Sequence, residues 1–333
     1  MLVNLTASTF SDYAFHSSVA IYLLALLLHL GEFARTRNVA APERELVATT
    51  VGADSMGSEV AAGDRDRVER DPVEPADGGQ GRRPWRERFG RMAVSLTVLG
   101  ALVHISSVVL RGVAVHRWPW GNMYEFISAI CLMAVLGWLV VLRRNPVVRP
   151  LGAFVLLPVE VLLFLAGTSL YVKAGPVMPA LQSYWLSIHV TAISIASGLF
   201  MVAGVASIMF LLRRYLSPDG RGAVLLSRLP SAQALDRLTY RITIFAFPLY
   251  TFAVICGAIW AEAAWGRYWG WDPKETVAFV VWVVYAGYLH SRATAGWRTT
   301  GAAWINTVGF AAVLFNLFFI NLAVSGFHSY AGL

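Results

Sequence analysis

Several runs of about twenty residues with almost no charged side chain determine what this chain can fold into. The hydrocarbon core of a bilayer is about 30 Å thick, and a helix of about twenty apolar residues spans it. Of the 333 residues, 57% are hydrophobic and only 14% are charged. Soluble globular domains carry about 25% charged residues, so this composition excludes an ordinary soluble protein. We expect an all-α integral membrane protein, because a helix satisfies its own backbone hydrogen bonds in lipid.

The apolar runs predict about eight transmembrane helices. Their expected ranges are 14–34, 89–111, 123–142, 150–170, 184–212, 241–260, 275–290 and 304–324. Residues 1–34 then hold the first helix, and residues 89–333 form a membrane domain of seven helices. Residues 35–88 are rich in Arg, Asp, Glu, Gly and Pro and have almost no aromatic residues, so they cannot bury a core. We expect them to form a disordered cytoplasmic linker.

Basic residues are distributed unevenly over the loops between the expected helices. One set of alternate loops holds eleven arginines: Arg143, Arg144, Arg149, Arg213, Arg214, Arg221, Arg228, Arg237, Arg241, Arg292 and Arg298. The other set holds five basic residues: Arg111, Arg117, Lys173, Arg267 and Lys274. Because basic loops stay in the cytoplasm, this asymmetry places both termini and the loop 261–276 outside the plasma membrane. The same asymmetry explains the net charge of +7 without invoking nucleic acid.

The expected external loop contains the most distinctive pattern in the chain. Residues 265–276, called the Trp-rich loop below, read WGRYWGWDPKET. The end of this segment predicts a helix start, because Asp272 is a good N-cap, Pro273 suits the first helical position and Glu275 completes a capping box. An interfacial belt of aromatic residues is the simpler interpretation. A dense cluster beside a capped helix instead favours a flat, apolar ligand edged by polar groups, and a porphyrin is one.

At these residues the chain resembles a known family. WGRYWGWDPKE matches the tryptophan-rich WWD signature of the haem-handling proteins of cytochrome c maturation, and is most similar to the CcsA/ResC type of system II, also called CcsB. Two further stretches agree, residues 120–126 (WGNMYEF) and 326–332 (GFHSYAG). The resemblance covers about residues 90–333. It implies a subunit of a holocytochrome c synthetase that delivers haem across the membrane for thioether attachment to apocytochrome CxxCH segments, with a ResB-type membrane partner.

The resemblance also implies which residues hold haem. Histidines at the motif positions of His189 and His328 are the axial ligands of an outer, bis-histidine haem b site in the family. Both are expected on the side of the Trp-rich loop, because His189 lies about one turn inside the fifth helix and His328 follows the eighth. The alternative is that His189 hydrogen-bonds within the bundle and His328 only ends a tail. The aromatic floor of the site and its acid would be Trp265, Trp269, Trp271 and Asp272.

His290 matches the family's membrane-embedded histidine, which holds haem nearer the inner side with a second ligand from the partner. It lies seventeen residues past Pro273, or about 26 Å along a helix, so it belongs near the cytoplasmic face. The alternative is a structural histidine in the last helical turn. His29 lies at a similar depth and is a weaker competitor for pairing with His290.

Other ionisable residues have less specific interpretations. Glu160 lies deep in the fourth helix, and an acid within the membrane is a candidate functional group. Glu125 either orders the Trp-rich loop or stabilises the start of its own helix. Arg267 and Lys274 either pair with haem propionates or lie at the interface. Arg117 stands where the family often has a histidine.

Two other functions are compatible with a membrane protein of this kind. A b-type cytochrome that only carries electrons needs paired histidines at both membrane depths, and this chain offers one convincing histidine at the inner depth. A transporter for another amphipathic ligand would show broken helices or an inverted repeat, and neither is visible in the sequence. Delivery of haem is therefore the function that we expect.

Overall fold

The computed structural model describes residues 3–34, 85–216, 228–294 and 299–324, together with 326 and 328. Every regular element in these ranges is a helix. In chain order they are α1 (Leu5–Ala34), α2 (Trp85–Val115), α3 (Met123–Arg144), the 3-10 turn η1 (Pro146–Leu151), α4 (Gly152–Thr168), η2 (Pro179–Leu181), α5 (Tyr184–Tyr215), α7 (Ala232–Trp265), α8 (Pro273–Ala293) and α9 (Thr300–Ala323).

The eight long helices correspond one to one with the eight predicted from the apolar runs. Seven of them are long and apolar enough to cross a membrane. The remaining one, α8, has 21 residues and carries charged side chains in its first and last turns, which lowers its mean hydropathy. The prediction of an all-α, multi-pass membrane protein is confirmed.

Several helix boundaries differ from the sequence prediction; α7, for example, was expected at 241–260 and runs from Ala232 to Trp265. The first helix was expected at 14–34, but α1 already begins at Leu5, where the side chain of Asn4 accepts a hydrogen bond from the Ala7 N–H. The predicted linker, 35–88, lies outside the described residues except for its last four, which belong to α2. In the first turn of this helix Trp85 contacts Phe89 and lies under the Arg88 guanidinium.

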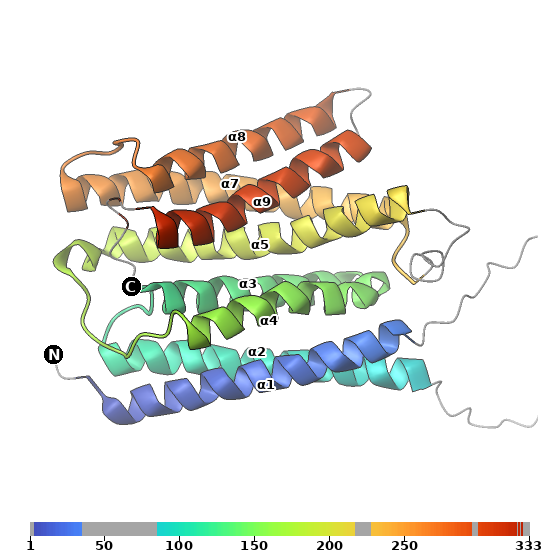
Figure 1. The fold of residues 1–333 in the computed structure, drawn as a ribbon, viewed down its shortest axis with the longest axis horizontal. Helices are drawn as coiled ribbons and strands as arrows, with labels where there is room; N and C mark the ends of the chain where they lie inside the picture. The colour runs from blue at the N-terminus through green and yellow to red at the C-terminus, as the bar shows by residue number, and fades with distance from the viewer. Residues whose placement is uncertain are drawn as a thin grey trace, which may run out of the picture.

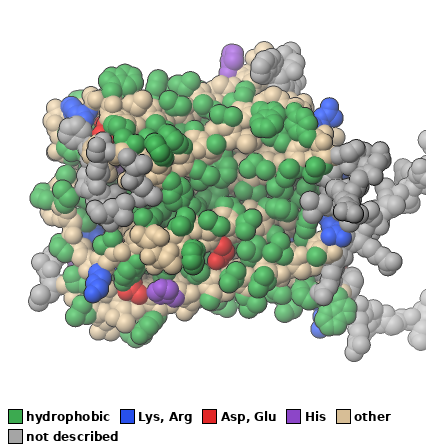
Figure 2. Space-filling model, in the orientation of Figure 1, with side chains coloured by type: hydrophobic (Ala, Val, Ile, Leu, Met, Phe, Trp, Pro, Cys, Tyr) green, Lys and Arg blue, Asp and Glu red, His purple; other side chains and the backbone are tan. Residues whose placement is uncertain are grey.

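The helices run side by side along the long axis of the molecule (Figure 1). In that view α1 and α2 form one edge, α3 and α4 lie next to them, and α8 forms the opposite edge. The central helix α5 packs against α3 on one side and against α7 and α9 on the other. Figure 2 shows a flank covered by hydrophobic side chains, with Lys and Arg gathered towards the two ends of the bundle. This is the distribution that a bilayer requires of a spanning bundle.

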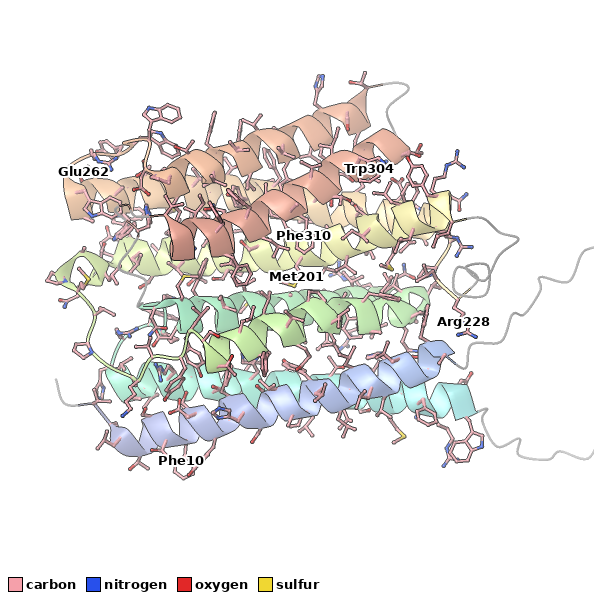
Figure 3. All side chains as sticks on the ribbon, in the orientation of Figure 1. Phe10, Met201, Arg228, Glu262, Trp304 and Phe310 are labelled. Atoms are coloured by element: carbon pink, nitrogen blue, oxygen red, sulfur yellow. The ribbon has the colours of Figure 1, made fainter. Side chains whose placement is uncertain are left out.

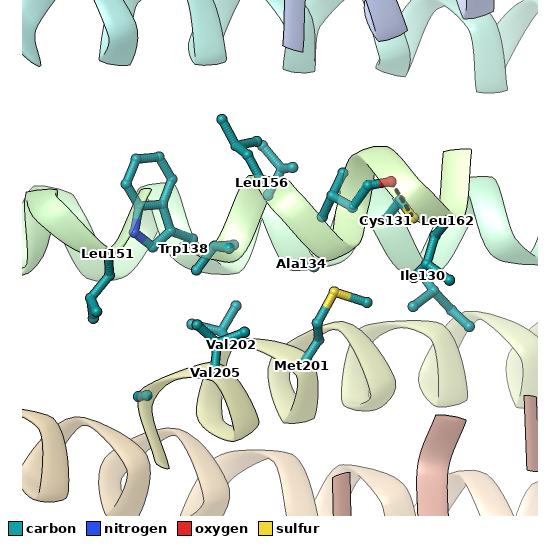
Figure 4. Packing of buried hydrophobic residues seen from close by; sticks show 14 of the residues in the cluster. Ile130, Cys131, Ala134, Trp138, Leu151, Leu156, Leu162, Met201, Val202 and Val205 are labelled. Atoms are coloured by element: carbon teal, nitrogen blue, oxygen red, sulfur yellow. Dashed lines mark hydrogen bonds between the residues drawn. The ribbon is translucent and has the colours of Figure 1, made fainter. Parts of the chain in front are cut away.

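Close packing joins the two halves of the bundle at α5. Side chains of α3, α4 and α5, including Trp138, Leu156 and Met201, interdigitate in the larger hydrophobic core (Figure 4). A Cβ on Gly198 of α5 would lie only 2.6 Å from the Ala134 nitrogen of α3, so glycine permits this close approach. On the other side of α5, Phe310 of α9 points back towards the helix that carries Met201 (Figure 3). His189, the histidine of α5, is thereby carried by a closely packed central helix.

The Trp-rich loop and the ends of the described chain lie at one end of the bundle. The start of α1, the loop from α2 to α3, the loop from α7 to α8 and the end of α9 gather there (Figure 1). Figure 3 places Glu262 at this end and Arg228 at the other. All five basic residues that we counted for the less basic side belong to this end, namely Arg111, Arg117, Lys173, Arg267 and Lys274.

Candidate functional site

A cleft, part of it open to the surface, lies at the end of the bundle that carries the Trp-rich loop. It is bounded by α5, α7, α8, α9, the start of α3 and the loops that precede α3 and α8. Most of its lining is aromatic or aliphatic, and includes Trp120, Phe126, Val190, Trp260, Tyr268 and Trp269.

His189 enters the cleft from α5 and is held by α7. Its Nδ1 lies 2.7 Å from the carbonyl oxygen of Ala253, which can only accept a hydrogen bond, so Nδ1 carries the proton. The Nε2 lone pair of this tautomer is available to a ligand or metal. The ring lies parallel to the indole of Trp260, with 6.3 Å between centroids. Gly257 leaves the space for the imidazole, since a Cβ there would lie 2.7 Å from its Cε1 atom.

His328 reaches the same cleft from the segment that follows α9. Its Nδ1 lies 2.8 Å from Oδ2 of Asp272, and its ring meets Trp260 and Trp265 edge-on, at centroid distances of 6.0 and 5.1 Å. Burial lowers the pKa of His328 below its usual 6.5, while the hydrogen bond to Asp272 opposes that shift. The imidazole is therefore neutral at pH 7, and its Nδ1–H donates to the carboxylate. Its Nε2 keeps a lone pair, as in His189.

Asp272 is fixed by its place at the start of α8. The predicted capping box is confirmed: the Asp272 side chain caps the helix, and the Glu275 carboxylate accepts the Asp272 N–H at 3.2 Å and the Gly270 N–H at 2.8 Å. The loop before it turns through left-handed backbone at Gly266 (φ 71°), the C-cap of α7, and at Trp271 (φ 59°). Only the first of these residues is a glycine, so the turn at Trp271 is strained.

The three tryptophans predicted to form the floor of the site have different environments. Trp269 lines the cleft. Trp265 stands behind the lining, against Trp260 (4.8 Å between centroids) and His328. Trp271 is 65% exposed and meets Trp269 edge-on at 5.7 Å, outside the lining of the cleft. Of the three indoles, that of Trp269 lines the cleft, that of Trp265 packs behind the lining and that of Trp271 lies at the surface.

His290 is remote from this cleft, as its position in the sequence indicated. It is exposed in the last turn of α8, at the opposite end of the bundle from the Trp-rich loop. His29 cannot be its partner, although the sequence allowed that pairing by depth. His29 is buried against Trp138 and Glu32 in the half formed by α1 to α4, and α1 and α8 lie on opposite edges of the bundle.

Two tryptophans of the cleft were not among the residues predicted to bind a ligand. Trp260 is almost fully buried, and its indole N–H donates to the carbonyl of Ala180 at 2.9 Å. The rings of both cleft histidines lie beside its indole, so Trp260 contributes to the lining next to each of them. Trp120 lines the cleft from the loop before α3. Trp120 lies in the motif stretch 120–126, and Trp260 lies shortly before the Trp-rich loop. This proximity to the motifs is the sequence signal that could have identified both residues.

Glu125 orders the loop of Trp120, and not the Trp-rich loop. Its carboxylate accepts the Gly121 N–H at 2.7 Å and pairs with Arg111 at 3.0 Å and Arg117 at 2.9 Å. Its own N–H is capped by the side chain of Asn122, so it also starts α3. Arg117, which stands where the resembled family often has a histidine, is therefore a structural partner of an acid.

Comparisons with known proteins agree with the position of the cleft. Residues 120–328 match the family model of the cytochrome c assembly protein, and the lining of the cleft runs from Trp120 to His328. Cytochrome c biogenesis protein CcsA of Chlamydomonas reinhardtii is 34% identical over 254 residues, which are 71% of this chain and 69% of the relative. CcsA of Thermosynechococcus vestitus (strain NIES-2133 / IAM M-273 / BP-1) is 32% identical over 269 residues, 68% of this chain and 84% of the relative.

A solved structure shares the fold. The cytochrome c haem lyase CcmF superposes with a TM-score of 0.60 at 17% sequence identity. The superposition covers 96% of this chain and 47% of that protein, so the chain spans about half of its length.

Proposed function

This chain belongs to the cytochrome c assembly protein family as a CcsA-type cytochrome c biogenesis protein, and on that premise we propose that its cleft holds haem and presents it to apocytochromes c. Haem is the cargo, held as haem b between His189 and His328. The Trp-rich loop then faces the extracytoplasmic side of the plasma membrane. The greater number of arginines at the opposite end of the bundle supports that orientation.

The hydrogen bonds of the two histidines carry this proposal. Metal-binding histidines almost always donate their second ring N–H to a carboxylate or a backbone carbonyl, which fixes the tautomer and the ring orientation. His189 donates to a carbonyl of α7 and His328 to the Asp272 carboxylate. Two imidazoles prepared in this way, against one indole and in an apolar cleft, suit the two axial positions of a haem iron.

The chemistry required of the site is modest. When a cysteine thiol of the apocytochrome adds across a vinyl group of haem, sulfur bonds to carbon and the proton goes to the other vinyl carbon, so no external oxidant is consumed. The cleft has to hold the macrocycle, exclude water from it and release one axial position to the histidine of the CxxCH segment. Burial of the macrocycle against the aromatic rings of Trp120, Trp260 and Trp269 would hold it in the cleft. We propose that the protein acts with a ResB-type membrane partner in a holocytochrome c synthetase.

An inner haem position at His290 is a separate part of the proposal. Among the described residues no group of three or more His, Cys, Asp and Glu side chains is placed to hold a metal ion. His290 is exposed and remote from the other described histidines, so none of these can supply a second ligand for iron there, and we propose that the partner supplies it. The same separation argues against a b-type cytochrome that only carries electrons, which needs a second histidine pair within the chain.

The test is the absorption spectrum of the protein purified in detergent after co-expression with its partner and with abundant haem. We expect the reduced low-spin bands of bis-histidine haem b. His189→Ala and His328→Ala should each abolish these bands at the outer site and stop maturation of a reporter cytochrome c. His16→Ala is the matched control, because His16 is exposed on α1 and bonds only within its own helix, to Asp12. A colourless wild-type protein, or variants with unchanged spectra, would refute the proposal.

A further inference from the structure

The cleft contains one cation that the capping and packing of the loop do not use. Lys274 lies in the first turn of α8 and is the only Lys or Arg among the described residues that line the cleft. Its ammonium donates to the side-chain oxygen of Asn321 and lies 5.6 Å from the ring centre of Phe126. An ammonium has three N–H donors, so a single amide oxygen leaves donor capacity in apolar surroundings.

The carboxylates closest in sequence are engaged elsewhere. Glu275 accepts two backbone N–H groups of the loop and faces Arg267 at 3.6 Å. Asp272 binds His328 and accepts the backbone N–H of Lys274, so its attraction for the ammonium acts only over a longer distance. Within the described parts of the chain, no carboxylate lies within 4.0 Å of the Lys274 ammonium. Its charge is therefore not neutralised by a direct ion pair.

Helix stability does not account for a lysine at this position. The N-terminal turn of a helix carries the positive end of the helix dipole, which favours acids and disfavours cations. Lys274 and the start of α8 thus add their positive potentials at one wall of the cleft. Arg267 differs, because it pairs with Glu275, lies beside the Trp265 ring and is not part of the lining.

We propose that Lys274 binds a carboxylate of the ligand, and that the cleft thereby selects porphyrins with free acid side chains and fixes their orientation. This inference rests on the proposed function, since haem carries two propionates on one edge of the macrocycle. A propionate at Lys274 directs the opposite edge, which bears the vinyl groups, away from α8. Lys274 is then a positioning residue for thioether formation and takes no part in bond making.

The first experiment compares two ligands that differ only at the two propionate groups, which are charged in one and esterified in the other. Full-length protein in detergent, prepared without haem, is titrated with ferric protoporphyrin IX and with its dimethyl ester. We expect the wild type to bind the free acid about 10- to 100-fold more tightly than the ester, the range for a hydrogen bond between charged groups. Lys274→Gln should lose that preference and keep the low-spin spectrum, and Lys274→Arg should retain most of it.

The chain offers a matched control, because Lys173 and Lys274 are its only lysines. Lys173 lies exposed at the same end of the bundle and outside the cleft lining, so Lys173→Gln should bind both porphyrins as the wild type does. The second experiment needs no variant: an amine-reactive reagent labels the wild type with and without ferric protoporphyrin IX, and mass spectrometry measures both lysines. The porphyrin should protect Lys274 and leave Lys173 reactive.

The outcomes separate the two proposals. Equal discrimination between acid and ester in the wild type and in Lys274→Gln, or labelling of Lys274 unchanged by the porphyrin, overturns the role of Lys274 and leaves the histidine site intact. A wild-type protein that binds neither porphyrin overturns the proposed haem site, and the role of Lys274 with it.

Discussion

Replacement of Asp272 tests whether the cleft is organised around its histidines. This carboxylate has two tasks, since it caps α8 and accepts the Nδ1–H of His328 at 2.8 Å. Asparagine is about as good an N-cap as aspartate, but it has one oxygen in place of two and no charge. Asp272→Asn therefore preserves the cap and weakens the hold on His328, whereas Asp272→Ala removes both.

The two contributions have different magnitudes. Loss of an N-cap costs about 1 kcal/mol of stability, so Asp272→Ala should unfold at a lower temperature and Asp272→Asn close to the wild type. Loss of the group that orients a metal-binding histidine lowers metal affinity about 10- to 100-fold. An amide NH₂ turned towards His328 also favours the tautomer that carries its proton on Nε2, where the lone pair is needed. Both variants should thus bind haem 10- to 100-fold more weakly.

The assay combines thermal unfolding in detergent with haem titration of the purified protein. Asp12→Asn serves as the control, because Asp12 accepts from Tyr171 and faces Arg111 at the same end of the bundle but outside the cleft. The reasoning is refuted if Asp272→Asn binds haem with wild-type affinity and spectrum. It is equally refuted if the loss of affinity in both variants follows their loss of thermal stability.

Three further predictions use other parts of the molecule. His290→Ala should deplete haem at both positions if haem enters from the inner side. His189→Ala should keep the inner haem and lose attachment of haem to the cytochrome. The haem content of each variant, measured with and without added imidazole, tests both expectations. Deletion of 40–80 should leave maturation of a reporter cytochrome c intact, because the segment has few apolar residues. Glu125→Ala should destabilise the protein by about 3–5 kcal/mol, since Arg111 and Arg117 lose their shared carboxylate. Thermal unfolding measures that loss, and Glu87→Ala, exposed in the first turn of α2, is the control.

Much of the fold could be predicted from the sequence because lipid imposes strong rules on it. Runs of twenty apolar residues have few alternatives to a helix, and an alternating path places every second loop at the same end. The capping box at Asp272 and Glu275 was predictable for a similar reason, since it depends on residues three apart in the chain. The placement of His189 and His328 at the same end followed from counting helices.

The internal arrangement of the site depends on contacts between helices that no local pattern specifies. That Trp260 lies beside both histidines depends on how α7 packs against α5, and on the space that Gly257 leaves for His189. That Trp271 lies at the surface depends on its left-handed backbone, which a sequence pattern does not predict for a tryptophan. The isolation of His29 from His290 likewise follows from the order of helices across the bundle and not from depth.

The two histidines of the cleft stand on different elements, and this difference bears on how haem would be released. His189 stands on the central helix, packed against α7 through its hydrogen bond to Ala253. His328 follows the last helix, and its ring contacts the Asp272 carboxylate and the edges of two indoles. A ligand on a chain segment can withdraw without disturbing helix packing, whereas movement of a helix in a close-packed bundle cannot be local. If the cleft holds haem, the His328 side is therefore the one that yields to the apocytochrome histidine, and weakening Asp272 should loosen that side first.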